Sequence, residues 1–91
     1  MDSDVLFDIQ VSGLLGRHQF TTDPAPVVAE LRALGLDELV VRTVGHWVGY
    51  YGAEHTRTLC EALLAAYPAA QDWVADGHAR RTVAQHGTTG F

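Results

Sequence analysis

The sequence predicts an α+β domain, with helices on one face of a two-layer antiparallel sheet. Three observations support this fold class. Apolar residues alternate near the N-terminus, two segments carry helical apolar stripes, and residues 37–51 are rich in valine, glycine and aromatic residues. The order of elements is then β-β-α-β-β-α-α, to which a ferredoxin-like arrangement is the best match. Residues 1–91 are expected to form a single domain.

The first expected element is a strand at residues 4–12. Its apolar residues recur with a period of two, which places them on one face of a pleated strand: Val5, Phe7, Ile9 and Val11. Gly13 and Gly16 supply a turn, and residues 17–22 suit a returning strand. This hairpin would leave Leu14 and Leu15 at an exposed tip.

A helix is expected from about residue 24 to residue 34. Asp23 suits an N-cap, and Pro24 fits the first helical turn, where its missing N–H costs nothing. The helix has one apolar stripe, formed by Val27, Val28, Leu31 and Leu34. Gly35 and Leu36 fit a left-handed C-cap with a trailing hydrophobic contact.

Residues 37–51 allow two interpretations. As a helix capped by Asp37, they carry a regular stripe: Leu39, Val40, Thr43, Val44, Trp47, Val48 and Tyr51. As two strands, they are rich in β-branched and aromatic residues, and Gly45 marks a turn or a bulge. Each internal glycine costs a helix about 1 kcal/mol relative to alanine, and this penalty favours the strands.

The C-terminal part is expected to be mainly helical. A stripe through Leu59, Cys60, Leu63 and Tyr67 predicts a helix over residues 53–67, which Pro68 ends. A short helix follows, with Trp73 and Val74 facing inward and Gly77 at its end. Residues 79–86 suit an edge strand or a frayed helix, and residues 87–91 a flexible tail.

Composition excludes several function classes. The chain carries a net charge of −5, with six scattered arginines and no lysine, which is unfavourable for binding nucleic acid. Its apolar runs are too short to span a membrane, and its N-terminus lacks the basic region of a signal peptide. The single cysteine, Cys60, cannot form an intramolecular disulfide. We therefore expect a soluble cytoplasmic protein.

The spacing of the histidines predicts no metal site, because none of the five forms an i, i+4 ligand pair. His55 and Cys60 lie about 140° apart around a helix, too far for a catalytic pair. The segment GYYGAEH lacks the lysine and hydroxyl of a phosphate-binding loop. No cofactor is predicted.

Two hypotheses for function remain. In the first, the chain is a non-catalytic module that binds itself, as a homodimer, or another protein, through Trp47, Tyr51, Leu14 and Leu15. In the alternative, it is a small oligomeric, cofactor-independent acid–base enzyme or ligand carrier. Its pocket would then use His46, Tyr50 and His55.

Overall fold

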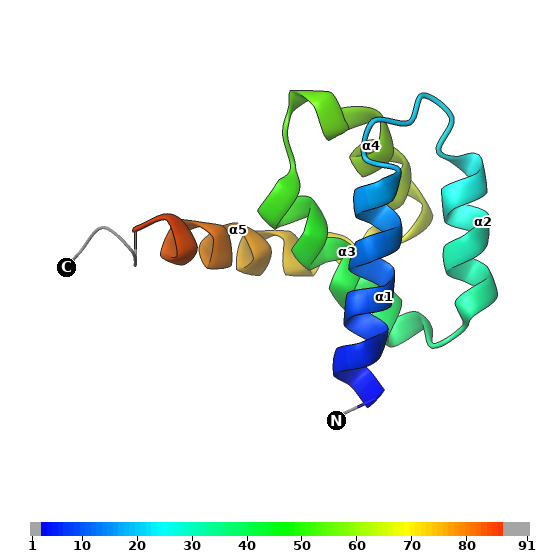
Figure 1. Ribbon diagram of the computed structural model, residues 1–91, viewed down its shortest axis with the longest axis horizontal. Helices are drawn as coiled ribbons and strands as arrows, with labels where there is room; N and C mark the ends of the chain where they lie inside the picture. The colour runs from blue at the N-terminus through cyan, green and yellow to red at the C-terminus, as the bar shows by residue number, and fades with distance from the viewer. Residues whose placement is uncertain (1–2, 87–91) are drawn as a thin grey trace.

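The computed structural model describes residues 3–86, and every regular element among them is helical (Figure 1). The elements are α1 (Ser3–Arg17), α2 (Ala25–Leu34), α3 (Asp37–Tyr51), η1 (Glu54–Thr56), α4 (Arg57–Ala66), η2 (Pro68–Ala70) and α5 (Gln71–His86). The prediction of an α+β domain with a two-layer sheet and a ferredoxin-like order was wrong, because this part of the chain contains no strand. The flexible tail expected at residues 87–91 lies outside the described residues.

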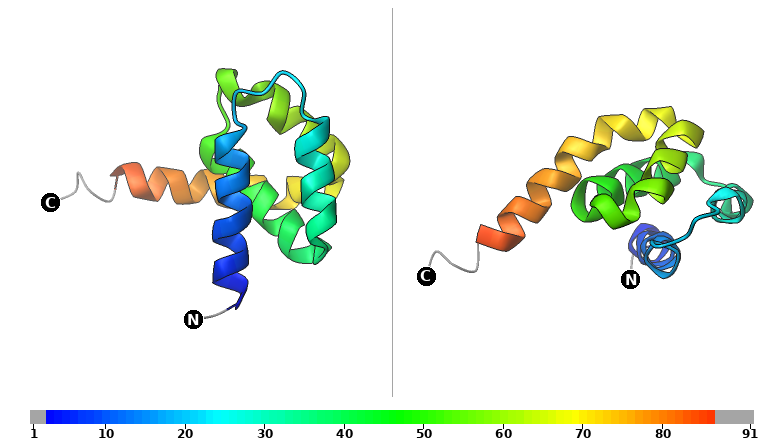
Figure 2. Two further views of the ribbon diagram at one scale, coloured as in Figure 1. Left: turned by 45° about the vertical axis from the view of Figure 1, so that its right-hand side comes forward. Right: turned by 90° about the horizontal axis from the view of Figure 1, so that it is seen from above.

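Helix α3 is the centre of the molecule. Seen from above, it lies between α1 on one side and α5 on the other (Figure 2, right). Seven of its 15 residues are buried. The core around it is formed by Val11, Leu14, Leu15, Val27, Leu31, Val40, Val44, Trp47, Val48, Leu59, Cys60, Leu63, Tyr67 and Ala70.

The hairpin predicted near the N-terminus is helix α1. Its buried residues are Val11, Leu14 and Leu15, at helical spacing, and Phe7 packs partly against the same core. The alternating residues that suggested a strand lie on different sides of this helix: Val5 and Ile9 are exposed, whereas Phe7 and Val11 contact the core. A continuing stripe of leucines decides in favour of the helix, because only helical spacing buries Leu14 and Leu15 together.

Helices α2 and α4 confirm the predicted segments to within a few residues. Gly35 is the C-cap and has a positive φ of 70°, but its ψ of −158° lies outside the expected left-handed region, which is occupied by Leu36 with a φ of 54° and a ψ of 51°. The predicted trailing contact is absent, because Leu36 is 63% exposed. Tyr67 separates α4 from the short helix η2, which begins at Pro68, so α4 ends before the proline as predicted.

Residues 37–51 form one helix, so the interpretation as two strands was wrong. Gly45 and Gly49 are interior helix positions at which α3 meets the backbone of η2, at Ala70, and of α5, at Val74. A Cβ at Gly45 would lie 2.3 Å from the Ala70 carbonyl oxygen, and one at Gly49 would lie 2.0 Å from the Val74 carbonyl oxygen. These glycines therefore allow two helix backbones to touch, and burial against α5 offsets their low helix propensity.

Helix α5 does not end at Gly77, in contrast to the sequence prediction. A Cβ at Gly77 would lie 2.3 Å from the His46 carbonyl oxygen, so this glycine belongs to the same contact with α3. Beyond it the helix continues to His86 and projects from the rest of the molecule (Figures 1 and 2). Residues 79–86, expected as an edge strand or a frayed helix, are therefore the last part of α5.

We expect Gly49→Ala to lower the free energy of unfolding by about 1–3 kcal/mol, because the added methyl group overlaps the backbone of α5. Gly13→Ala is a matched control in the interior of α1, where the nearest atom would be the Arg17 guanidinium at 3.7 Å. The control should gain up to about 1 kcal/mol from helix propensity. Urea denaturation measures both, and equal stability of the two variants would contradict the close contact of α3 and α5.

Candidate functional site

A small hollow lies where α1, α3 and α5 meet, with a volume of about 190 Å³. Its walls come from all three helices: Asp8, Ser12, Thr43, His46, Trp47, Tyr50, Tyr51 and Arg80. Because Gly45, Gly49 and Gly77 hold α3 and α5 in contact, the polar groups of both helices are fixed beside α1. This α1/α3/α5 hollow contains the largest set of chemically active side chains that the sequence singled out.

Two polar contacts join the helices around the hollow. The Thr43 hydroxyl donates a hydrogen bond of 2.6 Å to the Asp8 carboxylate, which ties α3 to α1. His46 Nε2 lies 2.6 Å from Asp76 Oδ2, and Arg80 Nε lies 3.4 Å from the same oxygen. The carboxylate is not aligned with the N–H of the His46 ring, so this contact is not a hydrogen bond, and Nε2 has no other partner among the described residues.

Aromatic rings surround these polar groups. The edge of the His46 ring meets Trp73, with centroids 5.4 Å apart at 90°. Tyr51 lies 4.7 Å from Tyr50 and 5.6 Å from Trp47, measured between ring centroids. The rings of α3 thus form a continuous aromatic wall that continues from the core, at Trp47, to the surface, at Tyr51.

The structure brings together two of the three predicted acid–base residues. His46 and Tyr50 line the same hollow, one turn apart on α3. His55 lies in η1, is exposed, and packs against Phe20 with ring centroids 5.1 Å apart. The Asp76 carboxylate beside His46 suits proton transfer. The third predicted residue, His55, does not line this hollow.

The four predicted interface residues have two different environments. Trp47 is 4% exposed, and Leu14 and Leu15 are also buried, so these three side chains pack in the core. The exposed tip expected at Leu14 and Leu15 does not exist, because the hairpin is a helix. Tyr51 is 52% exposed and is the one member of the four that reaches the surface.

Sequence reasoning missed three charged residues of this site: Asp8, Asp76 and Arg80. The i, i+4 spacing of Asp76 and Arg80 indicated a helical pair, but a helix end was placed between them at Gly77. Asp8 carried no signal, since it was assigned to a strand. Only the packing of α1 and α5 on α3 brings these charges together.

Cys60 is a buried core residue of α4, as the sequence predicted. Burial raises the pKa of its thiol from the ordinary 9.0, and the side-chain contact with Thr56 lowers it in part. The Thr56 hydroxyl lies 3.6 Å from the sulfur and accepts a hydrogen bond from the Ala53 N–H at 2.9 Å. The thiol is therefore protonated and is part of the packing at the start of α4.

Among residues 3–86, no group of three histidine, cysteine or acidic side chains is placed to hold a metal ion. No helix in the described part of the chain is both long enough and apolar enough to cross a membrane. We found no match to this chain among protein families, curated proteins or solved structures.

Trp47→Ala should lower the free energy of unfolding by about 3–5 kcal/mol, because a buried indole is removed from the core. Tyr51→Ala is the matched control on the same helix, and it should cost under about 1 kcal/mol because Tyr51 is half exposed. Thermal melting compares the two. A Trp47→Ala variant as stable as Tyr51→Ala would show that the indole is not buried.

The thiol of Cys60 should make stability depend on pH above 9. Its folded-state pKa is raised, so the unfolded state loses the proton first, and stability falls as pH increases from 9 toward the folded-state pKa. The urea midpoint of the native chain should therefore fall more between pH 8 and pH 10 than that of Cys60→Ala. Tyr67, whose pKa is raised by burial, contributes the decrease that both chains share. Equal decreases would contradict this assignment.

Proposed function

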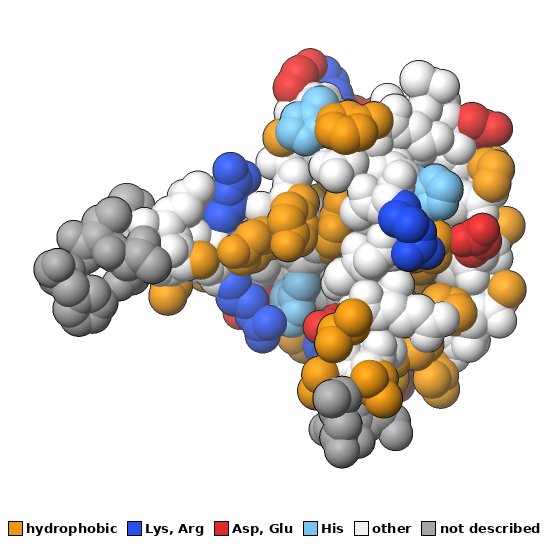
Figure 3. All heavy atoms as spheres, in the orientation of Figure 1, with side chains coloured by type: hydrophobic (Ala, Val, Ile, Leu, Met, Phe, Trp, Pro, Cys, Tyr) orange, Lys and Arg blue, Asp and Glu red, His pale blue; other side chains and the backbone are white. Residues whose placement is uncertain are grey.

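We propose that this chain is a non-catalytic module that self-associates as a homodimer. The observation that carries the proposal is a set of large apolar side chains exposed on two helices. Val5, Leu6 and Ile9 of α1 are 48%, 53% and 62% exposed, and Val83 of α5 is 69% exposed. Figure 3 shows hydrophobic side chains along the lower part of α1 and along the projecting part of α5. Apolar groups gathered in this way are typical of contact surfaces.

The projecting part of α5, residues 79–86, supports a partner for a second reason. It extends beyond Gly77 and His78, the last positions at which the α5 backbone closely meets α3, and nearly all of its described side chains are exposed. An isolated helix of this length is marginal in water, because most helical stability in proteins comes from tertiary packing. A second copy packed along this arm would supply that packing.

The two exposed helices diverge from the α1/α3/α5 hollow. Asp8 and Ser12 of α1 line the hollow, and Val5 precedes Asp8 by three residues on the same side of that helix. Arg80 of α5 also lines it, and Val83 follows Arg80 by three residues. The hollow is thus the polar vertex of a wedge, called here the α1/α5 wedge, whose two arms carry exposed valines.

Charge favours a second copy as the occupant of this wedge. The arm carries Arg80 and Arg81, and no acidic residue follows Asp76 in the sequence. The α1 side carries the Asp8 carboxylate. In a two-fold arrangement the same patch serves both copies, so each arm lies in the wedge of the other, with Arg81 near the partner's acidic side.

The alternative of an acid–base enzyme has weaker support. The hollow that holds His46 and Tyr50 has a volume of about 190 Å³. Small-molecule sites are usually about 300–1,000 Å³. We therefore propose no reaction for this hollow. A lone buried thiol at Cys60 suits a reducing compartment, and we place the module in the cytoplasm.

Size-exclusion chromatography with light scattering tests the proposal on the full chain. We expect twice the monomer mass of 9.9 kDa at high concentration, with dissociation on dilution. Val83→Asp and Ile9→Asp should each weaken the dimer at least about tenfold, because each places a charge in an apolar contact. Leu36→Asp is the control, since Leu36 is equally exposed but lies between α2 and α3.

The three variants also show whether association depends on the α1/α5 wedge or on exposed apolar residues in general. A mass of 9.9 kDa at every concentration would overturn the homodimer. A dimer weakened equally by Leu36→Asp and by Val83→Asp would overturn the assignment to the α1/α5 wedge. Circular dichroism of each variant checks that it stays folded, as expected for exposed positions.

A further inference from the structure

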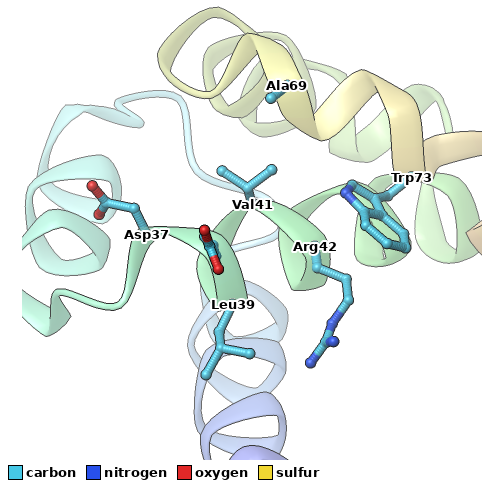
Figure 4. Close-up of a pocket in the computed structure, with 7 residues that line it drawn as sticks. Asp37, Leu39, Val41, Arg42, Ala69 and Trp73 are labelled. Carbon is cyan, nitrogen blue, oxygen red and sulfur yellow. The ribbon is translucent and has the colours of Figure 1, made fainter.

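A second hollow lies at the other end of α3, between α2, the start of α3 and the end of α4. Its volume is about 510 Å³, and its apolar wall includes Val41, Ala66 and Ala69. It adjoins a hollow of about 430 Å³, with which it shares Asp37, Val41 and Ala69. Figure 4 shows the adjoining hollow, with Asp37 at one end and Trp73 with Arg42 at the other. Together they form a groove large enough for a small molecule.

The Tyr67 hydroxyl at this groove lacks a well-formed hydrogen bond. Tyr67 lines the hollow and is only 8% exposed. Its oxygen is closed off from solvent and makes no hydrogen bond of good geometry among the described residues; its one hydrogen-bonding neighbour is the Arg32 side chain, which lowers the pKa of the hydroxyl. An unpaired buried hydroxyl costs about 1–3 kcal/mol, so native proteins rarely retain one without a use.

Two opposite charges stand beside this hydroxyl. Arg32 of α2 and Asp37 of α3 line the same hollow. Both act on the pKa of the Tyr67 hydroxyl. Burial has the largest effect and raises this pKa, the Arg32 guanidinium lowers it, and the Asp37 carboxylate raises it. Arg32 forms no ion pair within 4 Å in the described part of the chain. The groove therefore presents a cation, an anion and a hydroxyl beside an apolar wall.

We propose that this groove binds a free α-amino acid with an apolar side chain. The ligand carboxylate would pair with Arg32 and accept a hydrogen bond from Tyr67, and its ammonium would face Asp37. The side chain would lie on the wall of Val41, Ala66 and Ala69. A simple carboxylate fits less well, because Asp37 repels it, and a simple amine leaves Tyr67 and Arg32 unpaired.

Binding requires one movement of a side chain. The Tyr67 oxygen is not solvent-accessible, so a side chain at the groove has to move, and we assign this movement to Arg32, which acts on the hydroxyl. Arg32 is long and exposed, and no ion pair in the described structure holds it in place. The movement therefore breaks no contact that the core depends on. This site shares no residue with the α1/α5 wedge, so the proposal stands or fails apart from self-association.

Titration of the full chain with L-leucine, followed by backbone NMR shifts, tests the proposal. We expect saturable shifts at residues 32, 37 and 67. Two analogues of the same shape provide the comparison: 4-methylpentanoate lacks the ammonium, and 3-methylbutylamine lacks the carboxylate. Each should bind at least about tenfold more weakly than leucine. The absence of saturable shifts with leucine would overturn the site, and equal binding of 4-methylpentanoate would overturn the role of Asp37.

Tyr67→Phe separates a binding role from a structural one. Removing an unpaired buried hydroxyl should leave the melting temperature unchanged or raise it, while leucine affinity falls at least about tenfold. Arg32→Gln should lose affinity equally. Arg42→Gln, which changes an arginine of the adjoining hollow, is the matched control and should bind leucine like the native chain. Unchanged affinity in Tyr67→Phe, or equal losses in Arg32→Gln and Arg42→Gln, would overturn the proposal.

Discussion

The close contact of α3 with α5 is the constraint on which the rest of this structure depends. Three glycines make it, two on α3 and one on α5, and at each a Cβ would overlap facing backbone: that of η2 at Gly45, of α5 at Gly49 and of α3 at Gly77. This contact places Asp76 and Arg80 beside His46, and it seats the ring of Trp73 against the same histidine. The polar hollow and the direction in which α5 projects both follow from this contact.

The same contact explains why local preference misled the sequence analysis. Helix α3 holds four valines, a threonine and two glycines, all of low helix propensity. Their cost is offset by burial, because Val40, Val44 and Val48 face the core while Gly45 and Gly49 face α5. The helical stripe was visible in the sequence. The stabilisation gained when Gly45 and Gly49 pack against a neighbouring backbone could not be seen, because it depends on where the facing segment lies.

Other parts of the fold were predictable because local signals agreed with one another. In α2 the apolar stripe, the proline and the glycine C-cap indicated the same boundaries, and in α4 the apolar stripe and the following Pro68 did so. In α1 they conflicted: Val5 to Val11 alternate with a period of two, while Val11, Leu14 and Leu15 repeat as a helix. The four alternating residues alone favour a strand, and only the stripe that continues through Leu14 and Leu15 indicates the helix.

The site residues that could be predicted from the sequence lie in one element, and those that could not come from different elements. His46 and Tyr50 are four residues apart, a spacing that places them on one face of a strand or of a helix, so their pairing did not depend on how residues 37–51 were interpreted. Asp8, Asp76 and Tyr67 come from other elements, and no spacing within the sequence relates them to α3. Tyr67 was interpreted correctly as an apolar stripe residue, yet its unpaired hydroxyl depends on where Arg32 and Asp37 lie.

The two proposed surfaces lie at opposite ends of one helix. The first turns of α3 supply Asp37 and Val41 to the amino-acid groove, and its last turns supply His46 and Tyr50 to the vertex of the wedge. Because the glycine contact fixes α3 against α5 through backbone atoms, a shift of α3 at one end must be accommodated along the whole interface. Since α3 supplies side chains to both surfaces, a movement of this helix at one surface would also displace side chains of the other.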